Sequence, residues 1–217
     1  MTEIDKTELD ASHGRAIFKQ FLDENFDDKT LIDEFDKLTA LYFKVNSVIN
    51  ISALKTLDDI YIKHYLDSLY PYAHFSGACC DVGCGGGFPC LPLAIATKLH
   101  FTGVESVGKK LTLIHSAVSE LKLGNIRADY ARSEDLVKLG RKYDTVCCRA
   151  VADCEKSIKL CAPLVKSGGK LVLYRTQNDD RANQTIEISN NLTLTDTIDY
   201  LLPQTDIKRR LYLYTKN

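Results

Sequence analysis

The chain has 217 residues, of which 45% are hydrophobic, and its 28 Lys and Arg residues nearly balance its 29 Asp and Glu residues. This size predicts one globular domain with room for a subdomain, and the net charge of -1 excludes a global field that would hold the protein on nucleic acid or an anionic membrane. The opening MTEIDKTELD lacks the basic start and apolar core of a signal peptide, and no window approaches the ~20 apolar residues of a membrane span. We therefore expect a cytoplasmic protein that does not enter a membrane.

The first 75 residues predict a helical N-terminal extension. Apolar residues in 31–49 recur at alternating steps of four and three, which places them on one face of an amphipathic helix. An apolar group at 17–22 indicates a helix before it, and the apolar positions of 57–69 indicate a third helix that ends near Pro71. We assign residues 1–75 to this extension.

Beyond residue 75 the pattern changes to alternating strands and helices. Helices are expected at 89–99, 108–123 and 153–165. Strands are expected at 77–85, 100–106, 125–131, 143–151, 168–176, 191–203 and 208–217. Crossover helices imply a parallel sheet that is covered on both faces, whereas the last two strands lack an intervening helix and predict a closing antiparallel hairpin. The α/β core is thus expected to be a mostly parallel, twisted, Rossmann-like sheet over 76–217, forming a single compact unit.

Eight cysteines raise the question of disulfides or zinc, but no two of them form a C-x-x-C pair. Two adjacent pairs, Cys79-Cys80 and Cys147-Cys148, lie inside apolar strand patterns, where a reduced cysteine serves as a small buried hydrophobic residue. We expect neither a structural disulfide nor a metal site.

The segment DVGCGGGFPCLPLAIA at 81–96 places a glycine-rich turn between a strand and a helix. Gly83, Gly85 and Gly87 form G-x-G-x-G, and Glu105 ends the next strand, where it can accept hydrogen bonds from ribose hydroxyls. In a doubly wound sheet, ligands bind at this end of the strands, so the turn predicts a nucleotide-type ligand.

Two kinds of ligand bind a turn of this type, a pyrophosphate-containing cofactor and S-adenosylmethionine. A pyrophosphate binder has G-x-G-x-x-G running directly into a helix, whereas here Phe88-Pro89 intervene, with Pro89 suited to the first helical position. Asp81 would repel phosphates but suits the ammonium and sulfonium groups of S-adenosylmethionine. We therefore favour a class I methyltransferase core over a nicotinamide-dependent one.

Four segments together resemble one family, the RsmG (GidB) 16S ribosomal RNA guanine-N7 methyltransferases. They are 45–69, 81–96, 104–121 and 143–152, and the resemblance covers most of residues 42–175. Its most specific pieces are His64 with Asp67-Ser68-Leu69, the Gly-Phe-Pro-x-Leu-Pro run of 87–92, Ser106 with Gly108-Lys109-Lys110, and Arg149-Ala150 with Ala152. The sequence departs from the family pattern at Val45-Asn46, Cys90 and Arg175-Thr176.

The resemblance implies methyl transfer from S-adenosylmethionine to guanine 527 of 16S RNA, free or in a small-subunit precursor, by a monomer. Residues that it implies as cofactor contacts are Gly83, Phe88, Ser133, Glu134 and Arg149, with Arg149 at the junction of cofactor and target base. With the residues of the glycine turn, the full expected cofactor set is Asp81, Gly83, Gly85, Gly87, Phe88, Glu105, Ser133, Glu134 and Arg149. His64 and Asp67 lie three residues apart on a predicted helix and are expected to support this site.

Guanine N7 carries no proton, so an enzyme that methylates it needs alignment and charge stabilisation, not a general base. The stretch after the fourth strand agrees: it presents Arg149 as the candidate catalytic residue and lacks the Asn or Asp with Pro-Pro typical of amine methylation. Arg149 can hold guanine O6 or a phosphate oxygen. A nucleophilic role of Cys148 in cytosine methylation was weighed and discounted, because the motif lacks a preceding proline.

For RNA binding, the sequence predicts a local cationic strip, because clustered Lys and Arg side chains bind RNA phosphates even when the net charge of the protein is near zero. Its expected members are Lys109, Lys110, Arg175, Arg209 and Arg210. Two other functions stay open at this point: a small-molecule methyltransferase, and a non-catalytic protein that binds the cofactor or RNA.

Overall fold

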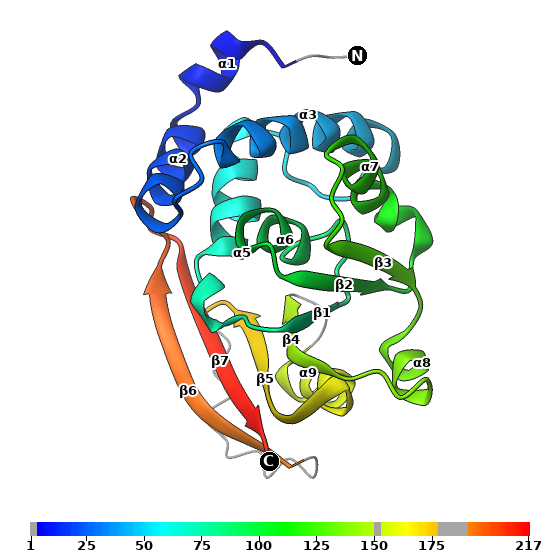
Figure 1. The fold of residues 1–217 in the computed structure, drawn as a ribbon. Coiled ribbons are helices and arrows are strands. Elements are labelled where there is room, and N and C mark those ends of the chain that lie inside the picture. Colours follow the sequence, from blue (N-terminus) through cyan, green and yellow to red (C-terminus); the bar gives the residue numbers. More distant parts are fainter. Residues whose placement is uncertain (1–3, 150–152, 178–190) are drawn as a thin grey trace.

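The computed structural model describes residues 4–149, 153–177 and 191–217 as an α/β fold built on one seven-stranded sheet (Figure 1). The strand order is β3-β2-β1-β4-β5-β7-β6. The strands are β1 (Ala78–Val82), β2 (His100–Glu105), β3 (Ile126–Tyr130), β4 (Tyr143–Arg149), β5 (Val165–Arg175), β6 (Leu192–Leu201) and β7 (Lys208–Lys216). The first five are parallel to one another, and the order reverses between β1 and β4. The predicted Rossmann-like sheet is confirmed.

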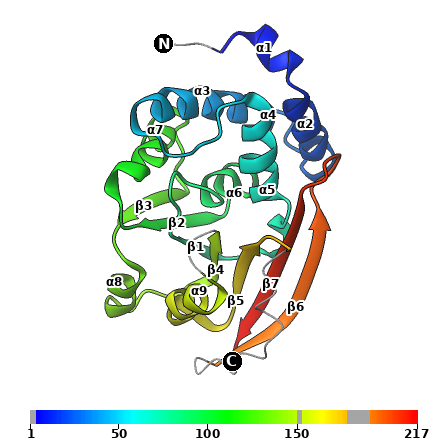
Figure 2. The same ribbon diagram turned by 180° about the vertical axis from the view of Figure 1, so that it is seen from behind.

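Helices cover both faces of the sheet, as expected for parallel strands joined by crossovers (Figure 2). One face carries the N-terminal helices together with α6 and α7, and the opposite face carries α8 and α9. The α-helices are α1 (Lys6–Ala11), α2 (His13–Asn25), α3 (Leu31–Ile49), α4 (Leu57–Asp59), α5 (Asp67–Leu69), α6 (Cys90–Thr97), α7 (Thr112–Glu120), α8 (Ser133–Lys138) and α9 (Cys154–Cys161). A π-helical segment η1 (Ile60–Leu66) and three 3₁₀ turns, η2 (Tyr72–His74), η3 (Gly108–Leu111) and η4 (Ala162–Leu164), complete them. None of the helices in the described ranges is long and apolar enough to cross a membrane.

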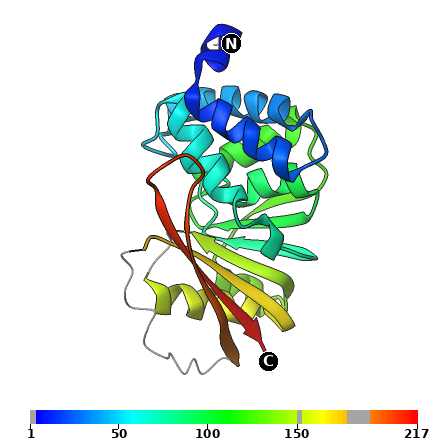
Figure 3. The same cartoon turned by 90° about the vertical axis from the view of Figure 1, so that its left-hand side faces the viewer.

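The predicted closing hairpin is confirmed, because β7 is antiparallel to both β5 and β6. Its tip reaches the N-terminal helices (Figure 3), where the side-chain amide of Gln204 donates to that of Gln20 over 2.8 Å. Close to this tip, the rings of Tyr70 and Tyr200 stack 4.5 Å apart. The last strands of the chain therefore contact the helical extension directly.

Two hydrophobic clusters fill the two faces, and the strand cysteines alternate between them as the pleat requires. Cys79 and Cys147 belong to the larger cluster under the N-terminal helices, whereas Cys80 and Cys148 belong to the smaller cluster under α8 and α9. All eight cysteines of the chain are buried free thiols. Their expected role as small buried hydrophobic residues is thus confirmed.

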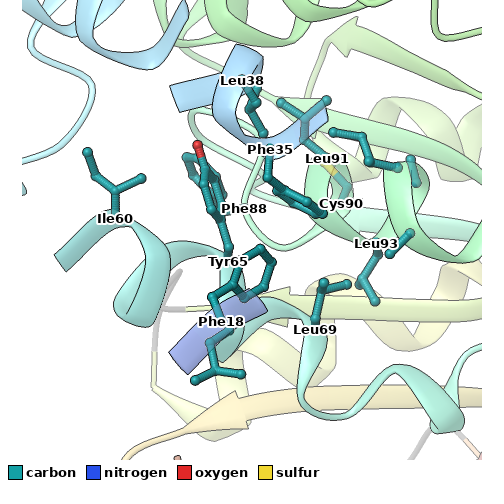
Figure 4. Close-up of a cluster of buried hydrophobic side chains, with 14 of the residues drawn as sticks. Phe18, Phe35, Leu38, Ile60, Tyr65, Leu69, Phe88, Cys90, Leu91 and Leu93 are labelled. Carbon is teal, nitrogen blue, oxygen red and sulfur yellow. The ribbon is translucent and has the colours of Figure 1, made fainter. Parts of the chain in front are cut away.

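The larger cluster joins the N-terminal helices to α6 (Figure 4). Phe18 of α2 meets Phe35 of α3 edge to face, with ring centroids 4.8 Å apart, and both pack on Tyr65 of η1. Phe88, just before α6, reaches the same aromatic group through Tyr65 at 6.1 Å. The helical extension is therefore continuous with the packing beneath the glycine-rich turn.

Several element boundaries differ from the sequence expectation. Pro89 precedes α6 as its N-cap and does not occupy the first helical position. The helix expected over 153–165 ends early, because the 3₁₀ turn at Pro163 leads directly into β5 at Val165. The motif residues Ala150 and Ala152 lie outside the described residues.

Candidate functional site

A cavity of about 400 Å³ opens at the carboxyl ends of β1, β2 and β3. Four predicted cofactor contacts, Gly83, Glu105, Ser133 and Glu134, line it, and so does Lys110 from the predicted RNA strip. The other lining residues are Val82, Val104, Ser106, Val107, Ala131, Arg132, Lys156 and Leu160. The sequence reasoning missed Arg132 and Lys156, because neither belongs to a motif. A mixed apolar and polar lining of this size suits a small-molecule ligand.

The glycine-rich turn takes a backbone path that favours glycine. Gly83, Gly85 and Gly87 have φ values of 72°, 55° and 100°, in the left-handed region. Gly87 is also confined sterically, since a Cβ there would lie 2.8 Å from Cγ1 of Ile114. The backbone N–H of Gly83 donates to the carbonyl of Val104 over 2.8 Å, which ties the turn to the end of β2.

Glu105, which lines the cavity, accepts hydrogen bonds from two backbone N–H groups. Its Oε2 accepts from the N–H of Gly85 at 3.1 Å, and its Oε1 accepts from the N–H of Val107 at 2.9 Å. The residue is buried, yet it lines the cavity. A carboxylate has about four acceptor positions, so Glu105 keeps capacity for ligand hydroxyl groups.

Asp81 lies behind the glycine-rich turn and is not part of the cavity lining. Its Oδ2 accepts the N–H of Cys90 at 3.2 Å, at the start of α6. The side chain is fully buried, and among the described residues Oδ1 has no hydrogen-bond partner. This burial raises the pKa of Asp81 from 3.8 to about 6, although the hydrogen bonds around Cys90 oppose the shift.

A second group of residues lies at the carboxyl end of β4. The imidazole of His64 stacks on the ring of Phe88, with centroids 4.0 Å apart and planes inclined by 4°. The guanidinium carbon of Arg149 lies 5.9 Å from the centroid of the same Phe88 ring. The structure therefore brings three predicted site residues together, beside the cavity and outside its lining.

Arg149 is held by three acceptors from one helical segment. Its Nη1 donates to the carbonyl of Lys63 at 3.3 Å and pairs with Oδ2 of Asp67 at 3.4 Å. Its Nη2 lies 3.5 Å from Nδ1 of His64. Lys63 and His64 belong to the π-helical segment η1, and Asp67 follows it directly. Such π-helical segments are frequent at functional sites.

The hydrogen bonds define the state of His64. Arginine only donates, so Nδ1 acts as the acceptor and the proton is placed on Nε2, which lies 3.1 Å from Oγ of Ser52. Burial first, and the charge of Arg149 second, lower the pKa of His64 to about 3. His64 is therefore neutral, and it shares with Asp67 the task of orienting Arg149.

Ser52 and Asn46 also belong to this site, and the sequence reasoning missed their roles. The amide side chain of Asn46 donates to the carbonyl of Ser52 and accepts from its N–H, both at 3.0 Å. Asn46 was noted only as part of a departure from the family pattern. The signal that could have identified them was the presence of two polar residues, Asn46 and Ser52, shortly before His64 in the sequence.

The residues of the predicted cationic strip lie in different surroundings. Lys109 and Lys110 lie together in η3 beside the cavity. Arg175, in contrast, is buried and donates to Oγ of Ser157 at 2.8 Å, so its guanidinium does not form part of a surface strip. The reason is that Arg175 ends an interior strand beneath α9.

Arg209 and Arg210 follow one another on β7 but have different partners. Nε of Arg209 pairs with Oδ1 of Asp67 at 2.9 Å, whereas Arg210 forms a two-pronged pair with Asp199 at 2.6 and 2.7 Å. Each arginine therefore has a carboxylate partner. Arg209 alone of these two joins the group around Arg149.

The chemistry of the cavity fits S-adenosylmethionine. Gly83 brings backbone close to the ligand space, and Glu105 offers carboxylate oxygens for ribose hydroxyls. Asp81 does not line the cavity, so its carboxylate can act on an ammonium group there only through its charge. Cys148, in contrast, is fully buried in the cluster under α8 and α9 and does not line the cavity. That placement disfavours a nucleophilic thiol.

Solved structures of other proteins share this fold. TrmN from Thermus thermophilus aligns with a TM-score of 0.55 at 16% identity, over 79% of this chain and 53% of that chain. TYW2 from M. jannaschii, solved in complex with AdoMet, aligns with a TM-score of 0.54 at 16% identity, over 69% of this chain and 74% of that chain. At these identities the similarity shows the fold alone.

Sequence comparison identifies the family. The family model described as rRNA small subunit methyltransferase G (GidB) matches residues 31–210. A ribosomal RNA small subunit methyltransferase G from Lysinibacillus sphaericus is 32% identical, covering 85% of this chain and 82% of the relative. One from Staphylococcus aureus is 30% identical, covering 87% and 83%. This chain therefore belongs to the rRNA small subunit methyltransferase G family.

Proposed function

We propose that this protein transfers the methyl group of S-adenosylmethionine to N7 of a guanine in 16S ribosomal RNA, and that the target is guanine 527. The observation that carries the proposal is an arginine, Arg149, which contacts Asp67 and Phe88 next to a cavity lined by Gly83 and Glu105. Membership in the methyltransferase family supports the reaction class.

The cofactor would be held mainly by groups at the ends of β1, β2 and β3. Gly83 would offer backbone contact, Glu105 would accept hydrogen bonds from the ribose hydroxyls, and Ser133 and Glu134, which line the same cavity, would border the adenine. Asp81 attracts the ammonium group from behind the glycine-rich turn. S-Adenosylmethionine, when bound, supplies an electrophilic methyl group.

The residues around Arg149 favour a target atom that needs no deprotonation. His64 is neutral, but its Nδ1 already faces Arg149. Both carboxylate oxygens of Asp67 are already paired, one with Arg149 and the other with Arg209. Guanine N7 presents a lone pair without a proton, so alignment and desolvation are sufficient for its reaction. An exocyclic amine, which must lose a proton, would be served badly here.

Arg149 would act by holding the target nucleotide in place. Its guanidinium is fixed by the carbonyl of Lys63, by Asp67 and by His64, so little conformational freedom is lost when the RNA binds. Its side chain is 15% exposed, which leaves part of it accessible to the target.

The test is to map 7-methylguanosine in unmodified 16S RNA after incubation with the protein and labelled cofactor. We expect one modified position, and we expect Arg149→Ala to lower kcat/KM by about 10² to 10³. Arg127→Ala is the matched control, because Arg127 pairs with Asp129 on β3, at the edge of the sheet. Cofactor binding without turnover would favour a non-catalytic protein, and methyl transfer that needs no RNA would favour a small-molecule substrate.

We further propose that the protein acts as a cytoplasmic monomer on 16S RNA or a small-subunit precursor. Because the net charge of the protein is near zero, a folded RNA target would be recognised through a local cationic patch. Lys109 and Lys110 are the first candidates for this patch. Initial rates on naked RNA, on precursor particles and on mature subunits would identify the preferred substrate. Sedimentation of the protein alone would give its oligomeric state.

A further inference from the structure

Three charged side chains meet where the C-terminal hairpin reaches the helical extension. Asp67 presents Oδ2 to Arg149 of β4 and Oδ1 to Arg209 of β7, at 3.4 and 2.9 Å. The exposed fractions of the Asp67, Arg149 and Arg209 side chains are 6%, 15% and 21%. One nearly buried carboxylate is therefore shared by two partly buried guanidinium groups.

The charges of this group do not cancel. Two guanidinium groups contribute +2 and Asp67 contributes -1, while His64 stays neutral. Arg210 and Asp199, the neighbouring pair on the same hairpin, form a one-to-one ion pair. In a partly desolvated site an excess positive charge attracts an anion much more strongly than it does in water.

Arg209 has hydrogen-bonding capacity left. Arg209 uses Nε for Asp67 and Nη1 for the carbonyl of Lys208, and within the described ranges its Nη2 has no acceptor. Tyr200, the cross-strand partner of Arg209, has a buried hydroxyl that also lacks a hydrogen-bond partner among the residues described. Unused hydrogen-bond donors and the excess positive charge therefore lie together around Arg209.

We propose that Asp67 couples Arg149 and Arg209 into one anion site, and that this site binds a phosphate of the RNA segment that carries the target base. In this arrangement Arg209, which lies on β7 of the C-terminal hairpin, is a second RNA-binding cation. Asp67 is a positioning residue, which acts on the RNA only through the two arginines. The inference rests on the proposed function, because it assigns a phosphate to the site of Arg149.

The reaction itself favours a phosphate over the guanine ring as the anion. Methylation at N7 places a positive charge on the base, and a guanidinium on O6 would oppose that charge. A phosphate carries its negative charge throughout the reaction, and it matches the planar donors of arginine. The two arginines would therefore anchor the nucleotide by its backbone and leave N7 unobstructed.

Two variants separate the two roles. Arg209→Gln removes one cation, so we expect about tenfold weaker RNA binding at moderate salt and a plot of log Kd against log salt concentration that is less steep by about one phosphate contact. Asp67→Asn keeps both cations, so we expect RNA affinity to be maintained or increased. Its kcat should fall by about a hundredfold, because Arg149 loses its alignment.

The matched controls come from Arg15 and Asp36, an ion pair 2.7 Å apart in the helical extension with side-chain exposures of 15% and 16%. Arg15→Gln and Asp36→Asn remove equivalent charges from a partly buried ion pair away from the proposed anion site. They should lower thermal stability without changing RNA affinity or kcat. If Asp67→Asn fails to fold, Asp67→Glu keeps the charge but displaces the carboxylate, and its kcat should fall by less than a hundredfold while RNA affinity stays unchanged.

The proposal is overturned if Arg209→Gln binds RNA as Arg15→Gln does, or if Asp67→Asn weakens RNA binding as much as Arg209→Gln. Failure of the proposed function has a different signature. The wild-type protein would then make no 7-methylguanosine, while the RNA-binding comparison between Arg209→Gln and Arg15→Gln would still decide whether the anion site exists.

Discussion

His64 lies flat against Phe88, with ring centroids 4.0 Å apart and planes inclined by 4°. One ring comes from the helical extension and the other from the turn that follows the glycines. Because His64 also contacts Arg149, this stacked pair connects the proposed cofactor side of the site to the proposed RNA side. Changes at either ring should therefore affect more than local packing.

The first prediction concerns Phe88. Phe88→Ala should lower the free energy of unfolding by about 3 kcal/mol, because it opens a cavity in a packed cluster, and it should also weaken cofactor binding. Phe75→Ala is the control, since both phenylalanines are 7% exposed in the same cluster. We expect a similar loss of stability there but an unchanged cofactor Kd by calorimetry. Equal cofactor affinities in the two variants would contradict a role of Phe88 in cofactor binding.

The second prediction concerns the pH dependence of stability through His64. Its folded-state pKa of about 3 lies below the ordinary 6.5, so between these values the unfolded chain binds more protons. The stabilisation is complete above pH 6.5 and is lost as the pH falls toward 3. The wild-type free energy of unfolding, relative to that of His64→Gln, should therefore drop by about 2 kcal/mol between pH 7.5 and 5.

Denaturant titrations of both proteins at several pH values would measure this difference. Asp81 titrates in an overlapping range with the opposite sign, because its folded-state pKa is raised to about 6. Since Asp81 is present in both proteins, its contribution cancels in the comparison. Parallel pH profiles for wild type and variant would show that His64 is not the group responsible.

The third prediction concerns cofactor binding through Asp81. With a pKa of about 6 in the free protein, the carboxylate is charged above that pH and attracts the cofactor ammonium. Lowering the pH from 7 to 5 protonates it, so cofactor affinity should fall about tenfold. Asp81→Asn should bind weakly at both pH values. A wild-type Kd that does not change over this range would remove Asp81 from the cofactor site.

The fourth prediction compares two glycines of the same turn. Gly85→Ala meets no atom within 4 Å, so it should cost only about 1 kcal/mol of backbone strain at its positive φ. Gly87→Ala brings Cβ to 2.8 Å from Ile114 and 3.2 Å from Leu91, and should cost about 3 kcal/mol. Thermal unfolding of the two variants would rank them. The reverse order would show that the turn can shift away from Ile114.

The fifth prediction concerns the folding unit. We propose that residues 1–75 and 76–217 unfold together, because Phe18, Phe35 and Tyr65 pack in the same cluster as Phe88. Denaturant curves followed by far-ultraviolet circular dichroism and by tyrosine fluorescence should coincide. Two separate transitions would mean that the extension folds independently of the sheet.

Much of the fold could be predicted because its strands and helices follow simple periodic patterns. The alternation after residue 75 gave the parallel sheet, and the absence of a helix between the last two strands gave the hairpin. The π-helical segment 60–66 could not be foreseen, because its side-chain spacing over so short a stretch resembles that of an α-helix. Tertiary contact with Arg149 accompanies its altered geometry.

The positions of site residues were predicted best where a sequence motif lies at the end of a strand. Gly83 and Glu105 both line the cavity, as their positions at strand ends implied. Charged residues distant in sequence were harder, because burial and ion pairing are decided by tertiary structure. Arg175 and Arg209 both looked like surface cations, but one is buried under α9 and the other pairs with Asp67. Sequence spacing alone carries no information on such long-range partners.

Asp67 and Arg209 are synthesised at different times, because 142 positions of the chain separate the two residues. During translation the carboxylate leaves the ribosome long before its β7 partner has been made. A nascent chain that has not yet added β7 has an unpaired edge on β5 and holds only one of the two guanidinium groups. Arg149 and Arg209 can therefore meet on the carboxylate of Asp67 only after β7 has been synthesised and has paired with β5.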